Sequence, residues 1–305
     1  RIHQTSPMVL PFSAGNIIMF RRRGWHIDIL LCNTCRYDIF EMQYRLDEGD
    51  FMTHYDIIVI GAATAGSFFA RRMAEGGHRV LVIEKLSQDT LATRLDIFHV
   101  GKGDFDRYGL PQPGPGDPDW AFEFDTSAAC SPTGSYPKRT RTPIVGMHMQ
   151  SYIARLNRWA EEAGAKIVYG AEFTGFIFEN GRIAGVRYRV DGREHQAAAR
   201  IVTDCSGIPS AARRALPDGY GVENFEITSS DMFYVILRYV KLAEQKEYIG
   251  EQGTRGWTYY KTWLAPGADP AGGIIGIGAN HSFDYAEEVY ETFVQNIDLP
   301  PHDVV

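Results

Sequence analysis

The chain has little of what marks secreted, membrane-spanning or nucleic-acid-binding proteins. It contains 4 cysteines in 305 residues, too few for a disulfide framework of this size. It has no apolar run of the roughly 18 residues that a membrane-spanning helix needs. Its formal net charge is -7, whereas a nucleic-acid-binding protein usually carries a basic face. These absences predict a cytoplasmic protein with no nucleic-acid partner, whose contact with a membrane would be peripheral.

The patterns of common hydrolytic and metal-dependent sites are missing too. The 9 histidines show no metal-ligand spacing, and no Ser-His-Asp or Walker-type pattern is present. Cys32 and Cys35 form a lone C-x-x-C motif without a second pair nearby. We therefore predict no metal site, and the residues alone identify no catalytic group.

Residues 55–85 do carry a recognisable pattern, that of a β-α-β unit. The short apolar run 56–60 predicts a buried strand. A glycine turn, 61–66, comes next and leads into helical spacing that ends at Gly76-Gly77. A second predicted strand covers 79–83 and is followed directly by Glu84. This order predicts a dinucleotide-binding unit.

Each part of this unit has a predicted role toward the dinucleotide. The helix N-terminus offers unpaired N–H groups and partial positive charge to a pyrophosphate. An acid at the end of the second strand accepts hydrogen bonds from ribose hydroxyls. The motif is G-x-A-x-x-G, because Ala63 stands where a glycine is usual. The predicted contacts are Gly61, Ala63, Thr64, Ala65, Gly66, Glu84 and Lys85.

The rest of the chain divides into an extension, a first domain and a second layer. Residues 1–51 differ in character from the remainder of the chain, and Met52 precedes the first strand. We hypothesise that Met52 is the native start and that 1–51 is an extension. Residues 52–217 form the predicted nucleotide-binding domain. From 218 to 305 strands succeed one another without helices until a closing helix at 285–297, which predicts an antiparallel layer.

Two stretches inside the first domain allow more local predictions. Proline and glycine interrupt 91–143 repeatedly, which predicts an irregular surface excursion with aromatic anchors. Asn180-Gly181 separates two alternating segments, which predicts a β-hairpin.

Three stretches together resemble a known family. The first is the glycine turn through Glu84-Lys85. The second, 202–214, is similar to the second flavin motif of FAD-dependent oxidoreductases, hydrophobic-x-D-A-x-G-x-x-S-x-x-R-R. The third, 263–267 with a G-x-G at 276–278, resembles a motif of the geranylgeranyl reductase family, which shares the fold of the flavin aromatic hydroxylases. Lys261 and Ala265 depart from that motif, where the family has Tyr and Phe.

This resemblance covers about residues 52–297 and implies an α/β fold, with a Rossmann-like FAD-binding domain and an antiparallel β-sheet substrate-binding layer. It implies FAD as cofactor, with NAD(P)H or a small electron carrier as reductant. Asp204 and Gly207 would lie close to the flavin, and Lys261, Trp263 and Pro266 would contact substrate. The family's third flavin motif, a Gly-Asp-Ala stretch, is not found before Val305. We therefore expect the chain to be truncated at its C-terminus.

The resemblance implies that the protein reduces C=C bonds of a small, apolar, isoprenoid-like substrate. One alternative is an FAD-dependent monooxygenase or halogenase that acts on an aromatic substrate. A second alternative is a nucleotide-binding fragment without catalysis. The sequence leaves the substrate, the electron donor and the oligomeric state open.

Overall fold

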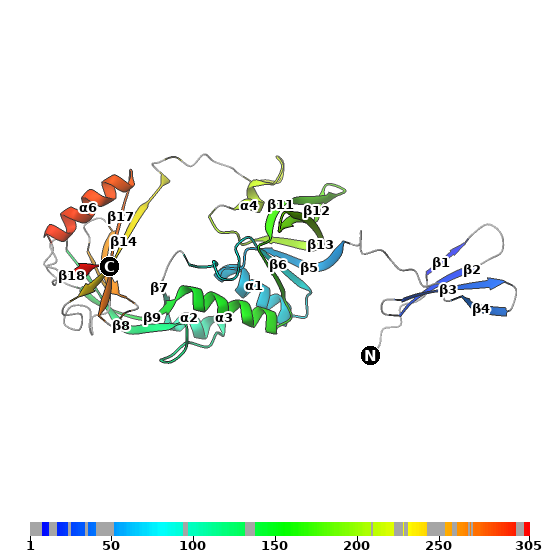
Figure 1. Cartoon of the computed structure of the whole chain (residues 1–305), viewed down its shortest axis with the longest axis horizontal. Coiled ribbons are helices and arrows are strands. Elements are labelled where there is room, and N and C mark those ends of the chain that lie inside the picture. The colour runs from blue at the N-terminus through cyan, green and yellow to red at the C-terminus, as the bar shows by residue number, and fades with distance from the viewer. Residues whose placement is uncertain are drawn as a thin grey trace. The chain divides into compact units, whose positions relative to one another are not determined.

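The computed structural model describes residues 8–11, 17–23, 26–33, 36–40, 52–93, 97–131, 138–208, 210–222, 228, 231–242, 254–257, 261–267, 269, 271–296 and 302–305. The chain divides into two compact units, Arg1–Phe51 and Met52–Val305 (Figure 1). None of the helices in the described ranges is long and apolar enough to cross a membrane.

The first unit is a four-stranded antiparallel sheet. Its strands have the order β1-β2-β3-β4. They are β1 (Met8–Pro11), β2 (Ile17–Arg23), β3 (His26–Asn33) and β4 (Arg36–Phe40). Cys32 lies in β3, and Cys35 lies outside the described residues.

The second unit begins with a mixed six-stranded sheet that confirms the predicted β-α-β pattern. The strand order is β10-β6-β5-β13-β12-β11. Four strands are parallel: β10 (Lys166–Tyr169), β6 (Val80–Glu84), β5 (Thr53–Ile60) and β13 (Arg193–Asp204). The antiparallel pair β11 (Glu172–Glu179) and β12 (Arg182–Val190) completes it. Asn180 and Gly181 join this pair with φ of 50° and 73°, as the predicted hairpin turn requires.

Helices cover both faces of the six-stranded sheet. Alternate residues of β5 and β6 pack on one face with α1 (Thr64–Glu75) and α3 (Met149–Glu162). The intervening residues pack on the other face, where Ala212 of α4 (Ala211–Arg214) joins them. Because both faces are buried, these strands are apolar at successive positions, and that continuity made them recognisable in the sequence.

The second sheet has eight strands in the order β18-β14-β17-β16-β15-β8-β9-β7. They are β7 (Ile97–Gly101), β8 (Trp120–Cys130), β9 (Lys138–His148), β14 (Tyr234–Leu242), β15 (Thr254–Trp257), β16 (Lys261–Pro266), β17 (Gly272–Ala279) and β18 (His302–Val304). Helix α6 (Phe283–Asn296) packs on one face through Ala286, Val289 and Phe293. Most pairings are antiparallel, and β15–β8 is parallel.

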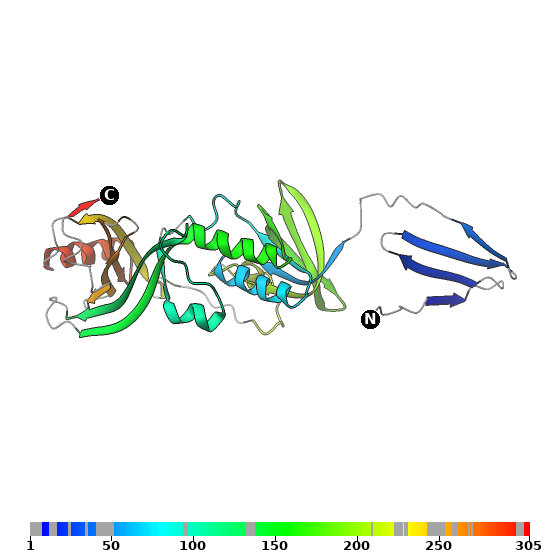
Figure 2. The same cartoon turned by 90° about the horizontal axis from the view of Figure 1, so that it is seen from below.

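The predicted irregular excursion at 91–143 was wrong. This region contains β7, α2 (Lys102–Tyr108), β8 and the first part of β9. Its aromatic residues belong to strands and to α2; the Phe122 ring of β8 lies over Gly146 of β9, where an added Cβ would come within 2.4 Å of it. Figure 2 shows β8 and β9 as a long green hairpin. The eight-stranded sheet therefore draws strands from both sides of the boundary predicted at 217.

Candidate FAD-binding site

The turn after β5 is held closely against the loop after β13. The Gly61 N–H donates to the Ile83 carbonyl at 2.8 Å, and the Cys205 N–H donates to the Ile60 carbonyl at 2.8 Å. Gly61 has a φ of 103°, and a Cβ there would lie 2.4 Å from the Cys205 carbonyl oxygen. A Cβ on Gly66 would lie 1.9 Å from the Gly61 oxygen. Both glycines are thus required by the packing of the protein itself.

The helix that continues from this turn begins without a capping side chain. Ala63 is its N-cap residue, and the first turn of α1 carries no acid. The backbone N–H groups of Thr64, Ala65 and Gly66 have no acceptor within the helix. Thr64 and Ala65 are also exposed. The positive end of α1 is therefore accessible to an anion such as a pyrophosphate.

Glu84, at the end of β6, is buried beside the same turn. Its Oε2 accepts a hydrogen bond from the Ala62 N–H at 2.8 Å, and its Oε1 accepts one from the Leu86 N–H at 2.9 Å. The side chain therefore joins β6 to the glycine turn, and each oxygen keeps a lone pair for a ligand hydroxyl. Lys85 is exposed next to it.

Ser67 and Asn157 form a buried polar pair that the sequence did not reveal. Ser67 is fully buried in α1, and its hydroxyl lies 2.7 Å from the Ala62 carbonyl oxygen. It also hydrogen-bonds with the Asn157 side chain in α3. The pair links the glycine turn to α3. A serine on a predicted buried helix face was the only local signal for it.

Asp204 organises the loop that touches Gly61. Its Oδ1 accepts from the Ser206 N–H at 2.9 Å and from the Ser206 hydroxyl at 2.6 Å, and its Oδ2 accepts from the Arg213 N–H at 2.8 Å. Burial raises the pKa of this carboxyl, but the hydrogen bonds from Ser206 and from the start of α4 outweigh burial and hold the pKa below its ordinary value. Gly207 is exposed in this loop, with a φ of 78°.

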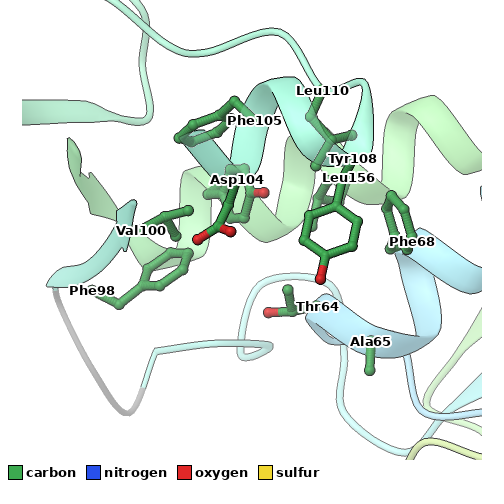
Figure 3. A pocket seen from close by; sticks show the side chains of 11 residues that line it. Thr64, Ala65, Phe68, Phe98, Val100, Asp104, Phe105, Tyr108, Leu110 and Leu156 are labelled. Atoms are coloured by element: carbon green, nitrogen blue, oxygen red, sulfur yellow. The ribbon is translucent and has the colours of Figure 1, made fainter. Parts of the chain in front are cut away.

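A cavity of about 410 Å³ opens at the first turn of α1. Its walls come from α1, β7, α2 and α3, and most of them are apolar (Figure 3). The lining residues are Thr64, Ala65, Phe68, Phe98, Val100, Asp104, Phe105, Tyr108, Leu110, Tyr152 and Leu156. Thr64 and Ala65 were predicted from the glycine motif. The others were not: Phe68 lies on α1 beyond the motif, and the rest lie in segments that the sequence did not connect to it.

The predicted substrate residues lie elsewhere, on β16 of the eight-stranded sheet. Trp263 is half-buried, and its indole covers Gly276, where an added Cβ would come within 2.0 Å of the ring. Trp263 and Pro266 are not among the residues that line the cavity. Lys261 pairs with Gly278 through its backbone, and its side chain lies outside the described residues. Leu264 packs in the core that contains α6, so strand alternation places Trp263 on the opposite face.

The described residues fit FAD at two points. The uncapped end of α1 provides N–H donors for a pyrophosphate, and Glu84 provides carboxylate oxygens beside it. An apolar cavity adjoins these groups and lies within the size range of small-molecule sites.

Comparison with known proteins agrees with this fit. Residues 54–266 match the FAD binding domain family. Over 236 residues the chain is 27% identical to the digeranylgeranylglycerophospholipid reductase of Methanocella arvoryzae, an alignment that covers 75% of this chain. The chain spans 58% of the length of that relative.

Solved structures with the same fold include oxidoreductases of different kinds. A geranylgeranyl bacteriochlorophyll reductase-like protein from Thermoplasma acidophilum superposes with a TM-score of 0.71 at 19% identity, covering 84% of this chain and 65% of that one. The myxobacterial chondrochloren halogenase gives a TM-score of 0.62 at 19% identity, covering 83% and 61%. These likenesses confirm the predicted fold class. Since the family match extends over more than half of the chain, the chain belongs to the FAD binding domain family.

Proposed function

We propose that the protein is an FAD-dependent oxidoreductase that reduces C=C bonds of an apolar, isoprenoid-like substrate. The observation that carries this proposal is the uncapped N-terminus of α1, which opens onto an apolar cavity and follows the turn that the Glu84 carboxylate contacts at Ala62. The substrate class is supported by the name of the Methanocella relative, a reductase of a digeranylgeranyl lipid.

In this proposal the chain's own residues bind and orient the cofactor. The N–H groups of Thr64 and Ala65 donate to the pyrophosphate, and Glu84 accepts from the adenosine ribose. Gly207 lets the loop after β13 approach the flavin side, and Asp204 holds that loop in shape. Bound FAD supplies two-electron transfer, while the protein contributes binding, orientation and exclusion of water.

The substrate surface in this proposal includes Trp263 and Pro266 on β16. The Trp263 indole covers Gly276 and offers an apolar surface on the face opposite α6. Lys261, two residues earlier, would attract an anionic head group such as a phosphate or a carboxylate. NAD(P)H or a small electron carrier would supply the electrons. A cytoplasmic protein with such a substrate would meet it at a membrane surface.

Reconstitution with FAD tests this function directly. The purified chain should retain the visible absorption of oxidised flavin after removal of free FAD. Under anaerobic conditions, with the flavin reduced by NAD(P)H or dithionite, it should add two hydrogens to each reduced double bond of a geranylgeranyl lipid, measured by mass spectrometry. If the chain binds no flavin, the alternative of a non-catalytic fragment is correct instead.

The cavity itself favours one competing function. In this alternative the aromatic rings of Phe68, Phe98, Phe105 and Tyr152 in the cavity wall contact an aromatic substrate of a monooxygenase or halogenase in place of the flavin. The consumption of O₂ distinguishes the reductase from the monooxygenase or halogenase. Consumption of O₂ that depends on an aromatic substrate, without reduction of the geranylgeranyl lipid, would favour the monooxygenase or halogenase.

A further inference from the structure

The cavity at α1 contains one carboxylate, that of Asp104. Asp104 is half-buried and, in Figure 3, its carboxylate points into the cavity between Val100 and Tyr108. No side-chain hydrogen bond or ion pair among the described residues uses this carboxylate. A half-buried carboxylate loses hydration, which is unfavourable unless a donor replaces the water.

The nearest cation on the same helix does not provide that donor. Lys102 Nζ contacts Asp125 Oδ1 at 3.0 Å and Glu123 Oε2 at 3.2 Å on β8. Arg107 lies over the Tyr108 ring, 5.5 Å from its centroid. The Lys102 and Arg107 side chains of α2 therefore lie against other groups, and Asp104, in the first turn of that helix, has no side-chain partner among the described residues.

The position of the cavity indicates which part of a ligand reaches Asp104. Thr64 and Ala65 belong both to the first turn of α1 and to the cavity wall. Glu84 contacts the turn at Ala62 and does not line the cavity. A dinucleotide with its pyrophosphate on α1 and its adenosine ribose on Glu84 therefore extends its other half into the cavity.

That other half, in FAD, is a chain of hydroxyl groups and then a flat aromatic ring. The cavity provides partners for both parts. Asp104 accepts hydrogen bonds, and the Tyr108 hydroxyl in Figure 3 lies near Thr64. The Phe68 and Tyr108 rings meet edge to face, with centroids 5.7 Å apart, and form one apolar wall.

We propose that this cavity holds the flavin half of FAD and that the Asp104 carboxylate accepts hydrogen bonds from the ribityl hydroxyl groups. The inference rests on the proposed function in taking FAD as the ligand. It makes Asp104 a residue that selects FAD over dinucleotides without a ribityl chain.

Comparing the affinity for FAD with the affinity for ADP distinguishes a contact between Asp104 and the flavin half from a general effect of the substitution on the site. ADP carries the adenosine and pyrophosphate of FAD without its flavin half. Calorimetric titration of the full chain should show that Asp104→Ala binds FAD about 10- to 100-fold more weakly, since hydrogen bonds to charged groups have that magnitude. Its affinity for ADP should equal that of the unsubstituted protein.

Two further variants complete the experiment. Asp106→Ala is the matched control, because Asp106 is exposed on the same helix and does not line the cavity; it should bind both ligands normally. Asp104→Asn keeps the side-chain volume and should weaken FAD alone, by less than Asp104→Ala. This variant replaces Asp104→Ala in the comparison if thermal unfolding of the FAD-free proteins shows that the alanine variant does not fold.

Three results would overturn the inference. Equal affinity of Asp104→Ala and the unsubstituted protein for FAD would remove the carboxylate from the flavin site and leave the proposed function intact. An equal loss for FAD and ADP would show a general effect on the turn. Failure of the unsubstituted protein to bind either ligand would refute the proposed function as well.

Discussion

Gly61 is constrained by the protein's own backbone, independently of any cofactor. A Cβ at this position would lie 2.4 Å from the Cys205 carbonyl oxygen, at a φ of 103°. Gly77 shares a positive φ, 82°, but has no atom within 4 Å of an added Cβ. We predict that Gly61→Ala lowers the free energy of unfolding of the FAD-free protein by about 2–5 kcal/mol, from strain and clash together.

Gly77→Ala is the control for strain alone and should lower the free energy of unfolding by about 1–2 kcal/mol. Urea denaturation of both variants without FAD gives the comparison. Similar losses at the two positions would show that the clash with Cys205 relaxes at little cost. Loss of FAD binding in a Gly61 variant is interpretable only after this measurement.

Glu84 has a structural role in addition to its predicted contact with ribose. It is 6% exposed, and both of its carboxylate oxygens accept backbone N–H groups. Glu84→Ala leaves the Ala62 and Leu86 N–H groups without this acceptor, so we predict a loss of about 1–3 kcal/mol in the stability of the FAD-free protein. A thermal unfolding midpoint equal to that of the unsubstituted protein would contradict this role.

Asp204 should make the stability of the protein depend on pH in acid. Its pKa in the folded protein lies below the ordinary value of 3.8, so the ionised form favours folding. This contribution is complete above the ordinary pKa and is lost as the pH falls through the folded-state pKa. Asp204→Asn, which resembles the protonated carboxyl, should therefore be less stable than the unsubstituted protein at neutral pH.

The difference in the free energy of unfolding between Asp204→Asn and the unsubstituted protein should shrink as the pH falls below 3.8. Denaturation with urea across the acid range measures it. A difference that stays constant through this range would mean that the charge of Asp204 contributes nothing beyond the shape of its side chain.

At the scale of elements, α3 is anchored by a buried ion pair. Arg155 Nη2 lies 2.7 Å from Asp119 Oδ2, and the two side chains are 11% and 3% exposed. The Arg155 guanidinium also lies over the Trp159 ring, 4.8 Å from its centroid. This anchor helps to place Tyr152 and Leu156 of α3 in the cavity wall.

Asp119→Asn would leave the Arg155 guanidinium charged and without its counter-ion. Burial raises the pKa of the Asp119 carboxyl in spite of Arg155, so desolvation offsets part of the attraction within the pair, and we predict that the substitution lowers the free energy of unfolding by about 1–3 kcal/mol. Glu162→Gln on the same helix is the control, because Glu162 and Arg158 are each 62% exposed and 3.7 Å apart. It should change stability by less than about 1 kcal/mol. Equal effects of the two substitutions would contradict an anchoring role.

At the scale of the whole molecule, residues 52–305 contain three hydrophobic cores. The three cores draw on residues from Tyr55 onward, and Arg1–Phe51 forms a separate compact unit. We predict that a chain of residues 52–305 binds FAD with unchanged affinity. Its thermal midpoint should fall by less than about 2–4 °C, the equivalent of about 1 kcal/mol for a domain of this size. A larger fall would mean that the first unit stabilises the second.

Local patterns were enough to predict the β-α-β unit. The run 56–60, the glycine turn and Glu84 lie within about 30 residues of one another, and each leaves a strong local signal of periodicity or backbone geometry. The hairpin at Asn180-Gly181 was predictable for the same reason. The strands at 91–143 were not, because β8 pairs with β15, far along the chain, as well as with β9.

The sequence by itself determined the β-α-β unit, its glycine turn and its acid, because these depend on contacts between near neighbours in the chain. Only the tertiary structure decided that Asp104, Tyr108, Tyr152 and Leu156 share one cavity with Thr64. Those residues come from α2 and α3, which meet α1 through packing of buried side chains. Such packing has no fixed spacing along the chain, so no motif could have placed Asp104 beside the end of α1.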